Sequence, residues 1–279
     1  MSQNPLPCYE VYALRYATLQ QRHRRDNFIA DPHDGPMPMD YFVWLIRGDG
    51  RTVLVDTGFN AKAAAARGRT LLRCPIEALS ALDVKPSQIE DVIVTHMHYD
   101  HAGNLDLLPH ARIHIQEAEL QYTVSRHMTF KPLRHPFCVH DVAHTVHRLF
   151  RDDIRFHIGD SQFAPGIELL LIGGHTLGLQ SVRVHTARGW VVLASDASHY
   201  YENIGTEAPF PLVHDVSAML AGHRRLLTLA DSTRHLVPGH DPLVRMIYPQ
   251  VGTGEPEIVQ LHRPPTMDPL ENFASSRSH

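Results

Sequence analysis

Residues 92–104 constrain the fold of this chain more than any other stretch. The run begins with β-branched residues, and within six positions it then carries three histidines and one carboxylate: His96, His98, Asp100 and His101. Such a run predicts a buried strand, whose alternation would send His96 and His98 to the same side. Gly103-Asn104 permits a turn after the strand, so Asp100 and His101 can face a second position. Because titratable groups are rarely buried together without ion partners or a metal, the stretch predicts a dinuclear metal site.

Other candidate ligands follow predicted strands farther along the chain. His175 comes after the apolar run Ile167 to Ile172, Asp196 after Trp190 to Ala194, and His240 after a short strand that begins near residue 235. Imidazole and carboxylate groups without a thiolate suit zinc best, although iron, manganese or cobalt would also fit. The candidate metal ligands are therefore His96, His98, Asp100, His101, His175, Asp196 and His240.

Predicted strands and helices alternate around these ligands, which favours a layered α/β fold over a helix bundle. The runs Tyr41 to Ile46 and Thr52 to Val55 flank a Gly-containing turn and predict a β-hairpin. Asp56, at the end of that hairpin, either caps a turn or holds a metal ligand by a hydrogen bond. We expect one catalytic domain over residues 1–250, and a loop and tail rich in Pro, Gly and Ser over residues 251–279.

The charge and the apolar pattern exclude several classes of partner. A net charge of -4 gives no basic surplus for nucleic acid, and no apolar run has the length of a membrane span. The N-terminal residues lack the pattern of a signal peptide, so we expect a cytoplasmic protein. Three distant cysteines predict neither disulfides nor a thiolate zinc site. The expected partner is a small-molecule substrate, and a homodimer is left open.

The segment 139–150 is typical of an amphipathic helix. His140 and His144 stand at metal-binding spacing in it, but the apolar face of the helix alone explains the pattern. We hypothesise that this helix covers the metals together with Phe28, Met37 and Met39. The alternative is that these side chains make ordinary core or dimer contacts.

The stretch His96-Met97-His98-Tyr99-Asp100-His101 matches the His-x-His-x-Asp-His signature and resembles the metallo-β-lactamase superfamily. The resemblance covers roughly residues 41–242. With Gly173 to Gly178 and Ser195 to Ser198, the chain looks most like the N-acyl homoserine lactonases, whose activity is called quorum quenching. This resemblance implies a four-layer αββα sandwich, of mixed α/β (α+β) class, with its metal site at one edge between two sheets.

The resemblance also implies a division of the ligands. One metal would be bound by His96, His98 and His175, the other by Asp100, His101 and His240, and Asp196 would bridge them. Zinc β-lactamases usually lack such an Asp, and flavodiiron proteins carry Glu in place of the second motif histidine. Glyoxalase II and long-form ribonuclease Z share the ligand set, so the ligands alone do not determine the substrate.

Two adjacent divalent cations, expected to be zinc, would lower the pKa of a bridging water and polarise a carbonyl. We therefore expect a hydrolase that opens an N-acyl homoserine lactone-like ring, with Asp100 accepting or relaying a proton. The alternatives are hydrolysis of another ester, a thioester, a cyclic amide or a phosphoester by the same fold. A further alternative is an iron-dependent sulfur dioxygenase.

One position departs from the lactonase pattern. The lactonases carry a Tyr three residues after the bridging Asp, whereas this chain has His199, followed by Tyr200 and Tyr201. A donor there would stabilise the negative charge that develops on the substrate oxygen. We expect His199 to supply this donor, with Tyr200 as the alternative. A third alternative is that His199 has a purely structural role and packs beside the metals.

Overall fold

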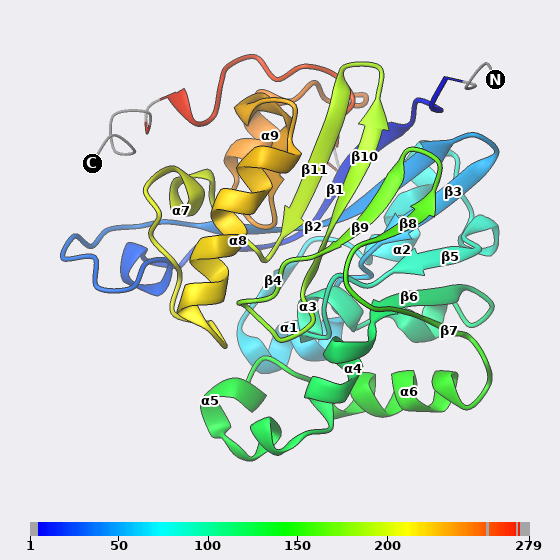
Figure 1. The fold of residues 1–279 in the computed structure, drawn as a ribbon, viewed down its shortest axis with the longest axis horizontal. Coiled ribbons are helices and arrows are strands. Elements are labelled where there is room, and N and C mark those ends of the chain that lie inside the picture. The colour runs from blue at the N-terminus through cyan, green and yellow to red at the C-terminus, as the bar shows by residue number, and fades with distance from the viewer. Residues whose placement is uncertain (1–4, 255–256, 272, 274–279) are drawn as a thin grey trace.

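The structure is a computed structural model that describes residues 5–254, 257–271 and 273. It contains two β-sheets, which lie between two groups of helices (Figure 1). The larger sheet has the strand order β13-β1-β2-β3-β5-β6-β7, with β4 paired to β1, and the smaller has the order β12-β11-β10-β9-β8. These layers confirm the α/β sandwich that the sequence predicted.

The larger sheet begins with antiparallel strands and continues with parallel ones. β2 and β3 form the predicted hairpin, whose turn residues Asp49 and Gly50 both have positive φ, as a tight hairpin turn requires. β3, β5, β6 and β7 then run parallel and are joined by helical crossovers. The strands are β1 Glu10–Leu19, β2 Met39–Gly48, β3 Arg51–Val55, β4 Thr70–Leu71, β5 Asp91–Ile93, β6 Arg112–Gln116, β7 Ile154–His157 and β13 Ile258–Gln260.

The smaller sheet is antiparallel from β8 to β11 and ends in a parallel pair of β11 and β12. Its inward side chains pack on those of the larger sheet, and this core includes Trp44, Val182 and Leu193, all of them fully buried. The strands are β8 Ser161–Ala164, β9 Ile167–Leu171, β10 Gln180–Thr186, β11 Gly189–Ser195 and β12 Leu236–Pro238.

Helices cover the outer faces of both sheets. α8 packs on the smaller sheet, and α9 lies near it, while α1 to α6 lie on the side of the larger sheet (Figure 1). A second apolar core, which includes Leu54, Val92 and Ile113, lies under the latter group. The helices are α1 Ala61–Arg67, α2 Pro75–Ala78, α3 Tyr99–Ala102, α4 Glu117–Thr123, α5 Lys131–Arg134, α6 Val139–Leu149, α7 Tyr201–Gly205, α8 Val216–Leu229 and α9 Leu243–Ile247.

The segment after residue 250 differs from the sequence prediction. It was expected to be loop and tail, but Ile258–Gln260 forms β13, which pairs with β1 at the edge of the larger sheet. Three residues carry too little periodicity to predict a strand, and this one exists because β1 offers it a free edge. The rest of the predicted tail includes positions 255–256, 272 and 274–279, which lie outside the described residues.

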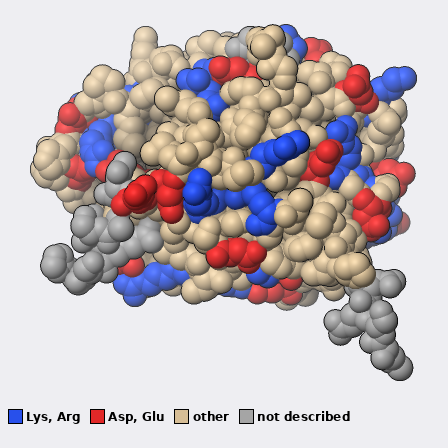
Figure 2. Space-filling view, turned by 90° about the horizontal axis from the view of Figure 1, so that it is seen from above, with Lys and Arg blue, Asp and Glu red and all other residues tan. Residues whose placement is uncertain are grey.

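The surface carries charges of both signs. On the face shown in Figure 2, Lys and Arg side chains lie among Asp and Glu side chains. This mixture agrees with the small net charge of the sequence, -4. Among the described residues, no helix is both long and apolar enough to cross a membrane.

Candidate metal centre

The candidate ligands come together at one edge of the two sheets because strands end there. His96 and His98 follow β5, and Asp100 and His101 lie on the short helix α3 directly after them. His175 follows β9, whereas Asp196 and His240 follow the parallel strands β11 and β12. All seven side chains are buried, at no more than 9% exposure. The sequence therefore predicted the location of the cluster correctly.

The local geometry of the first two histidines differs from the prediction. β5 ends at Ile93, so His96 and His98 project from a loop and not from an alternating strand. Their rings still lie together, with centroids 4.5 Å apart. The loop is held by Asp56, whose carboxylate accepts hydrogen bonds from the Thr95 N–H and hydroxyl, both at 2.7 Å. Tertiary hydrogen bonds thus replace strand alternation in aiming the two rings.

The nitrogen and oxygen atoms of the cluster form overlapping groups, each of which could bind a metal ion. Within each group, the candidate ligand atoms lie within 4.8 Å of one another. The groups are His96, His98 and His175; Asp100, His101 and His240; His96, His101 and Asp196; and His175, Asp196 and His199. The first two groups have the composition of the two ligand sets expected from the sequence. The geometry therefore supports two neighbouring cation positions.

Asp196 lies between these two groups. Its Oδ2 is 3.3 Å from Nε2 of His175, and its Oδ1 is 2.9 Å from Nε2 of His240. The same Oδ1 lies 3.3 Å from Nε2 of His101, and Oδ2 lies 3.8 Å from Nε2 of His96. Each carboxylate oxygen therefore faces a different group of histidines, which is the arrangement that a bridging ligand needs.

Several inward-facing atoms fit a bound cation. Among the described residues, Nε2 of His96, Nε2 of His101 and Oδ1 of Asp196 are buried without a hydrogen-bond partner. A buried polar atom left unpaired typically costs about 1–3 kcal/mol, so three in one place favour an additional ligand. Burial lowers the pKa of both His96 and His98, which keeps the rings in the neutral form that binds metals. The donor set suits divalent zinc, iron, manganese or cobalt.

The outer nitrogens of three cluster histidines are held by hydrogen bonds. Nδ1 of His175 donates to the Leu212 carbonyl at 2.7 Å, and Nδ1 of His240 donates to the Asp40 carbonyl at 2.9 Å. Nδ1 of His101 lies 2.7 Å from Oδ2 of Asp56. Of the two roles considered for Asp56, the structure therefore shows the one that orients a candidate ligand. Such contacts fix the tautomer and direct Nε2 into the cluster.

The backbone beside the cluster is unusual at two points. Ser195, which directly precedes Asp196, has a positive φ of 49°, a conformation that non-glycine residues rarely adopt and that is common at functional sites. Gly239 passes so close that a Cβ there would lie 2.8 Å from Oδ1 of Asp196. The position of Asp196 therefore depends on the strained backbone of Ser195 and on the absence of a side chain at Gly239.

His199 and Tyr200 lie in different surroundings. Nε2 of His199 is 3.0 Å from Oδ2 of Asp196, and its ring stacks on Phe210 with centroids 3.5 Å apart. The buried Tyr200 hydroxyl donates to the Pro38 carbonyl at 3.1 Å and accepts from the Asn27 amide at 3.2 Å. The Tyr200 hydroxyl is thus bonded to Pro38 and Asn27, whereas His199 lies beside Asp196.

Sequence reasoning did not identify Glu119, a fully buried carboxylate near the cluster. Its Oε1 accepts from the Met97 N–H at 2.9 Å, and its Oε2 accepts from the Thr176 hydroxyl at 2.6 Å and the Gly178 N–H at 3.0 Å. It therefore links the loop of His96 and His98 to the loop of His175. In the sequence it resembles an ordinary acidic residue in the first turn of a helix, so no local signal marks it.

The predicted cover over the metals has a different structure. Phe28 and Met39 are buried core side chains, each 2% exposed. In α6, Val139 points to solvent at 84% exposure, and Phe150, just after the helix, does so at 85%. Among the described residues, neither His140 nor His144 belongs to a group of candidate metal ligands. Phe28 and Met39 are therefore ordinary core residues. The residues of α6 follow the pattern of an amphipathic helix, without metal ligands among its described histidines His140 and His144.

Comparisons with known proteins agree with this architecture. The profile described as the Metallo-beta-lactamase superfamily matches residues 37–240. An N-acyl homoserine lactonase of Bacillus cereus is 29% identical over 217 residues, which cover 71% of this chain and 81% of the relative. The N-acyl homoserine lactonase AiiB of Rhizobium rhizogenes is 29% identical over 186 residues, 60% of this chain and 66% of that protein.

Solved structures show the same fold. An N-acyl homoserine lactone hydrolase with N-hexanoyl-L-homoserine at its catalytic metal centre has a TM-score of 0.71 and 21% identity, covering 85% of this chain and 95% of its own. AidC, a dizinc quorum-quenching lactonase, has a TM-score of 0.68 and 16% identity, covering 93% of this chain and 96% of its own.

Proposed function

Because this chain belongs to the metallo-beta-lactamase superfamily and is a metal-dependent hydrolase, we propose that it opens lactone rings of the N-acyl homoserine type. The observation that carries the proposal is the carboxylate of Asp196, whose two oxygens face separate groups of buried histidines. The similarity to N-acyl homoserine lactonases supports the choice of a lactone over other carboxylic esters.

We assign two adjacent metal positions to the described residues. His96, His98 and His175 would hold one cation, Asp100, His101 and His240 would hold the other, and Asp196 lies between the two groups. Two divalent cations bound there, zinc in our proposal, would supply an attacking hydroxide near neutral pH and Lewis acidity toward the substrate carbonyl. The protein contributes imidazole rings held in fixed tautomers and a site closed to most solvent.

Two side chains are assigned to proton and charge handling. Asp100 is 9% exposed, the most accessible of the seven candidate ligands, and we assign it the transfer of a proton to the leaving oxygen as the ring opens. His199 lies at the edge of the cluster, with Nε2 3.0 Å from Oδ2 of Asp196, and we assign it a hydrogen bond to the substrate oxygen that gains negative charge. The stacked ring of Phe210 holds the His199 ring in that position.

A substrate screen tests the proposal. Protein reconstituted with Zn²⁺ should release acid from N-acyl homoserine lactones without O₂, faster than from open-chain esters, thioesters, cyclic amides or phosphoesters. A preference for one of those substrates would contradict the proposed lactone substrate but would still agree with a hydrolase. O₂ uptake with an iron-loaded sample and a persulfide substrate would instead support a sulfur dioxygenase.

The two neighbouring residues His199 and Tyr200 should respond differently to substitution. At saturating metal, His199→Ala should lower kcat by about 10²-fold, because a directed hydrogen-bond donor in the cluster is lost. Tyr200→Phe should keep kcat near that of the wild type, since its hydroxyl bonds Pro38 and Asn27, and should lower only Tm. Unchanged kcat in His199→Ala would remove His199 from the catalytic residues, and a loss in Tyr200→Phe alone would restore the alternative.

We further propose that the chain acts in the cytoplasm, as a single catalytic domain, on a small-molecule substrate. A homodimer is the assembly that we propose for it. Light scattering after size-exclusion chromatography measures the assembly directly.

A further inference from the structure

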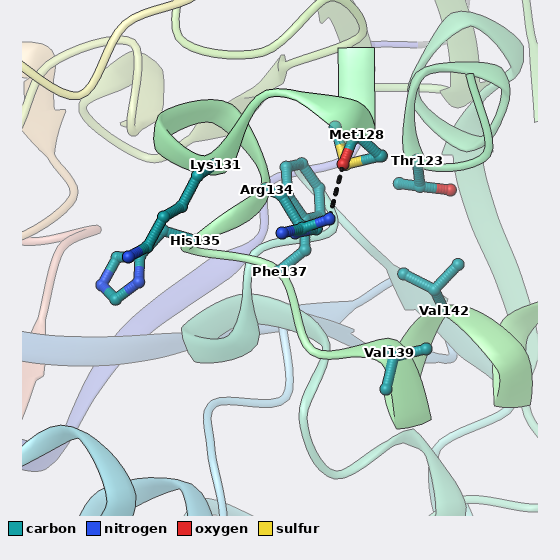
Figure 3. Close-up of a pocket in the computed structure, with 8 residues that line it drawn as sticks. All are labelled: Thr123, Met128, Lys131, Arg134, His135, Phe137, Val139 and Val142. Atoms are coloured by element: carbon teal, nitrogen blue, oxygen red, sulfur yellow. Dashed lines mark hydrogen bonds between the residues drawn. The ribbon is translucent and has the colours of Figure 1, made fainter. Parts of the chain in front are cut away.

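A pocket of about 450 Å³ lies between the end of α4, the turn Arg126–Thr129, α5 and the start of α6 (Figure 3). Apolar side chains line much of it, among them Met128, Phe137 and Val142. Its volume is within the range of small-molecule binding sites. None of the residues placed in the metal centre lines this pocket.

Phe137 connects the pocket to the metal centre. Its ring packs edge-on against the ring of His98, with centroids 4.5 Å apart, and the two residues form an isolated β-bridge. The Tyr99 N–H also donates to the Pro136 carbonyl at 2.9 Å, which fixes the pocket wall to the ligand loop. A molecule in the pocket would therefore lie one aromatic ring away from a proposed metal ligand.

The pocket carries positive charge without compensation. The cationic side chains of Lys131 and Arg134 line it, and no Asp or Glu does. Among the described residues, neither Lys131 nor Arg134 has a carboxylate partner within ion-pair distance; Arg134 only donates to the Met128 carbonyl at 3.3 Å. Figure 3 shows Arg134 directed across the pocket toward Met128. This contrasts with the net negative charge of the chain.

We propose that this pocket binds the acyl part of the substrate and selects chains that end in a carboxylate. The proposal rests on the function proposed above, since it places the scissile carbonyl at the metal centre. The apolar chain would then pack on Phe137 and Val142, and the terminal carboxylate would reach Arg134 and Lys131. Arg is suited to this role because its planar guanidinium binds carboxylates through paired hydrogen bonds.

A matched pair of substrates tests the selection. Homoserine lactone acylated with suberic acid carries a free terminal carboxylate, whereas the octanoyl compound of equal chain length ends in a methyl group. The zinc-loaded wild type should show a kcat/KM about tenfold higher for the suberoyl compound, as expected for one or two exposed charge-assisted hydrogen bonds. Lys131→Glu/Arg134→Glu should reverse this preference, because kcat/KM should fall more for the suberoyl compound than for the octanoyl compound.

Arg51→Glu provides the control, because Arg51 is exposed on the β2–β3 hairpin and outside the pocket. This variant also replaces a cationic side chain by a carboxylate, and it should keep the preference of the wild type for the suberoyl compound. Equal kcat/KM values for the two substrates in the wild type, or a preference that survives in the Lys131→Glu/Arg134→Glu variant, would overturn the proposal.

A binding measurement separates this proposal from the proposed function. Calorimetry with suberic acid monomethylamide and with N-methyloctanamide needs no hydrolysis. Tighter binding of the carboxylate compound, lost in Lys131→Glu/Arg134→Glu and kept in Arg51→Glu, would support the pocket even if no lactone is hydrolysed. Equal binding of both amides by the wild type would reject the pocket whatever the enzyme hydrolyses.

Discussion

Replacing Asp196 by alanine should lower kcat/KM by about 10³-fold or more and reduce the bound metal from two ions per chain to one at most. The variant loses a carboxylate whose two oxygens face separate histidine groups, at 2.9 Å from His240 and 3.3 Å from His175. Without it, two neighbouring cations would repel each other with little negative charge between them. Metal analysis after dialysis and steady-state kinetics with the best lactone measure both effects.

Asp160→Ala is the matched control, because Asp160 is an exposed carboxylate that pairs with Arg225 away from the cluster. It should bind two ions and keep its activity. A wild type that saturates with one ion, or an Asp196→Ala variant with full activity, would contradict the dinuclear assignment.

Replacing Glu119 by alanine should weaken metal affinity by about 10–100-fold, the usual effect of removing a group that orients metal ligands. The change leaves the N–H groups of Met97 and Gly178 without their acceptor, and so separates the loop of His98 from the loop of His175. Each donor left unpaired typically costs about 1–3 kcal/mol, so stability should fall as well. Competition with a chelator measures the affinity, and Tm of the metal-free protein measures the stability.

Two further variants separate orientation of the ligands from stability. Glu119→Gln keeps the shape, but its amide presents N–H groups where the carboxylate accepts three hydrogen bonds, so metal affinity should fall to an intermediate value. Glu117→Gln changes an acidic residue in the same helical turn, and should behave as the wild type because Glu117 accepts a hydrogen bond from Gln121 of its own helix. If Glu119→Ala lowers Tm but leaves metal affinity unchanged, Glu119 stabilises the fold without positioning the ligands.

Much of the candidate metal centre could be predicted from the sequence, because the relevant signals are local. Histidine and Asp side chains that directly follow apolar runs mark strand ends, and strand ends of an α/β sandwich meet at one edge. For this reason His175, Asp196 and His240 were placed with the first four ligands although they are distant in the chain. The strand β13 was missed, because its three residues form a strand only by pairing with β1.

The choice between His199 and Tyr200 could not be made in the same way. Both residues are aromatic, adjacent and close in sequence to Asp196, so spacing favours neither strongly. The turn after Ser195, with its positive φ, sends His199 toward Asp196, while Pro38 and Asn27 hold Tyr200 elsewhere. Those two partners lie more than 160 residues away in the sequence.

The sequence by itself determined the layered α/β class of the fold and the types of the candidate metal ligands, because strand periodicity and ligand spacing are properties of neighbouring residues. The resemblance to the metallo-β-lactamase superfamily implied the edge at which these ligands meet. Only the tertiary structure decided which oxygen of Asp196 faces which histidines, that Glu119 ties two ligand loops together, and that Lys131 and Arg134 line a pocket behind Phe137. Side-chain direction in loops depends on hydrogen bonds to residues far away in the chain, and such contacts exist only after the sheets and helices have packed.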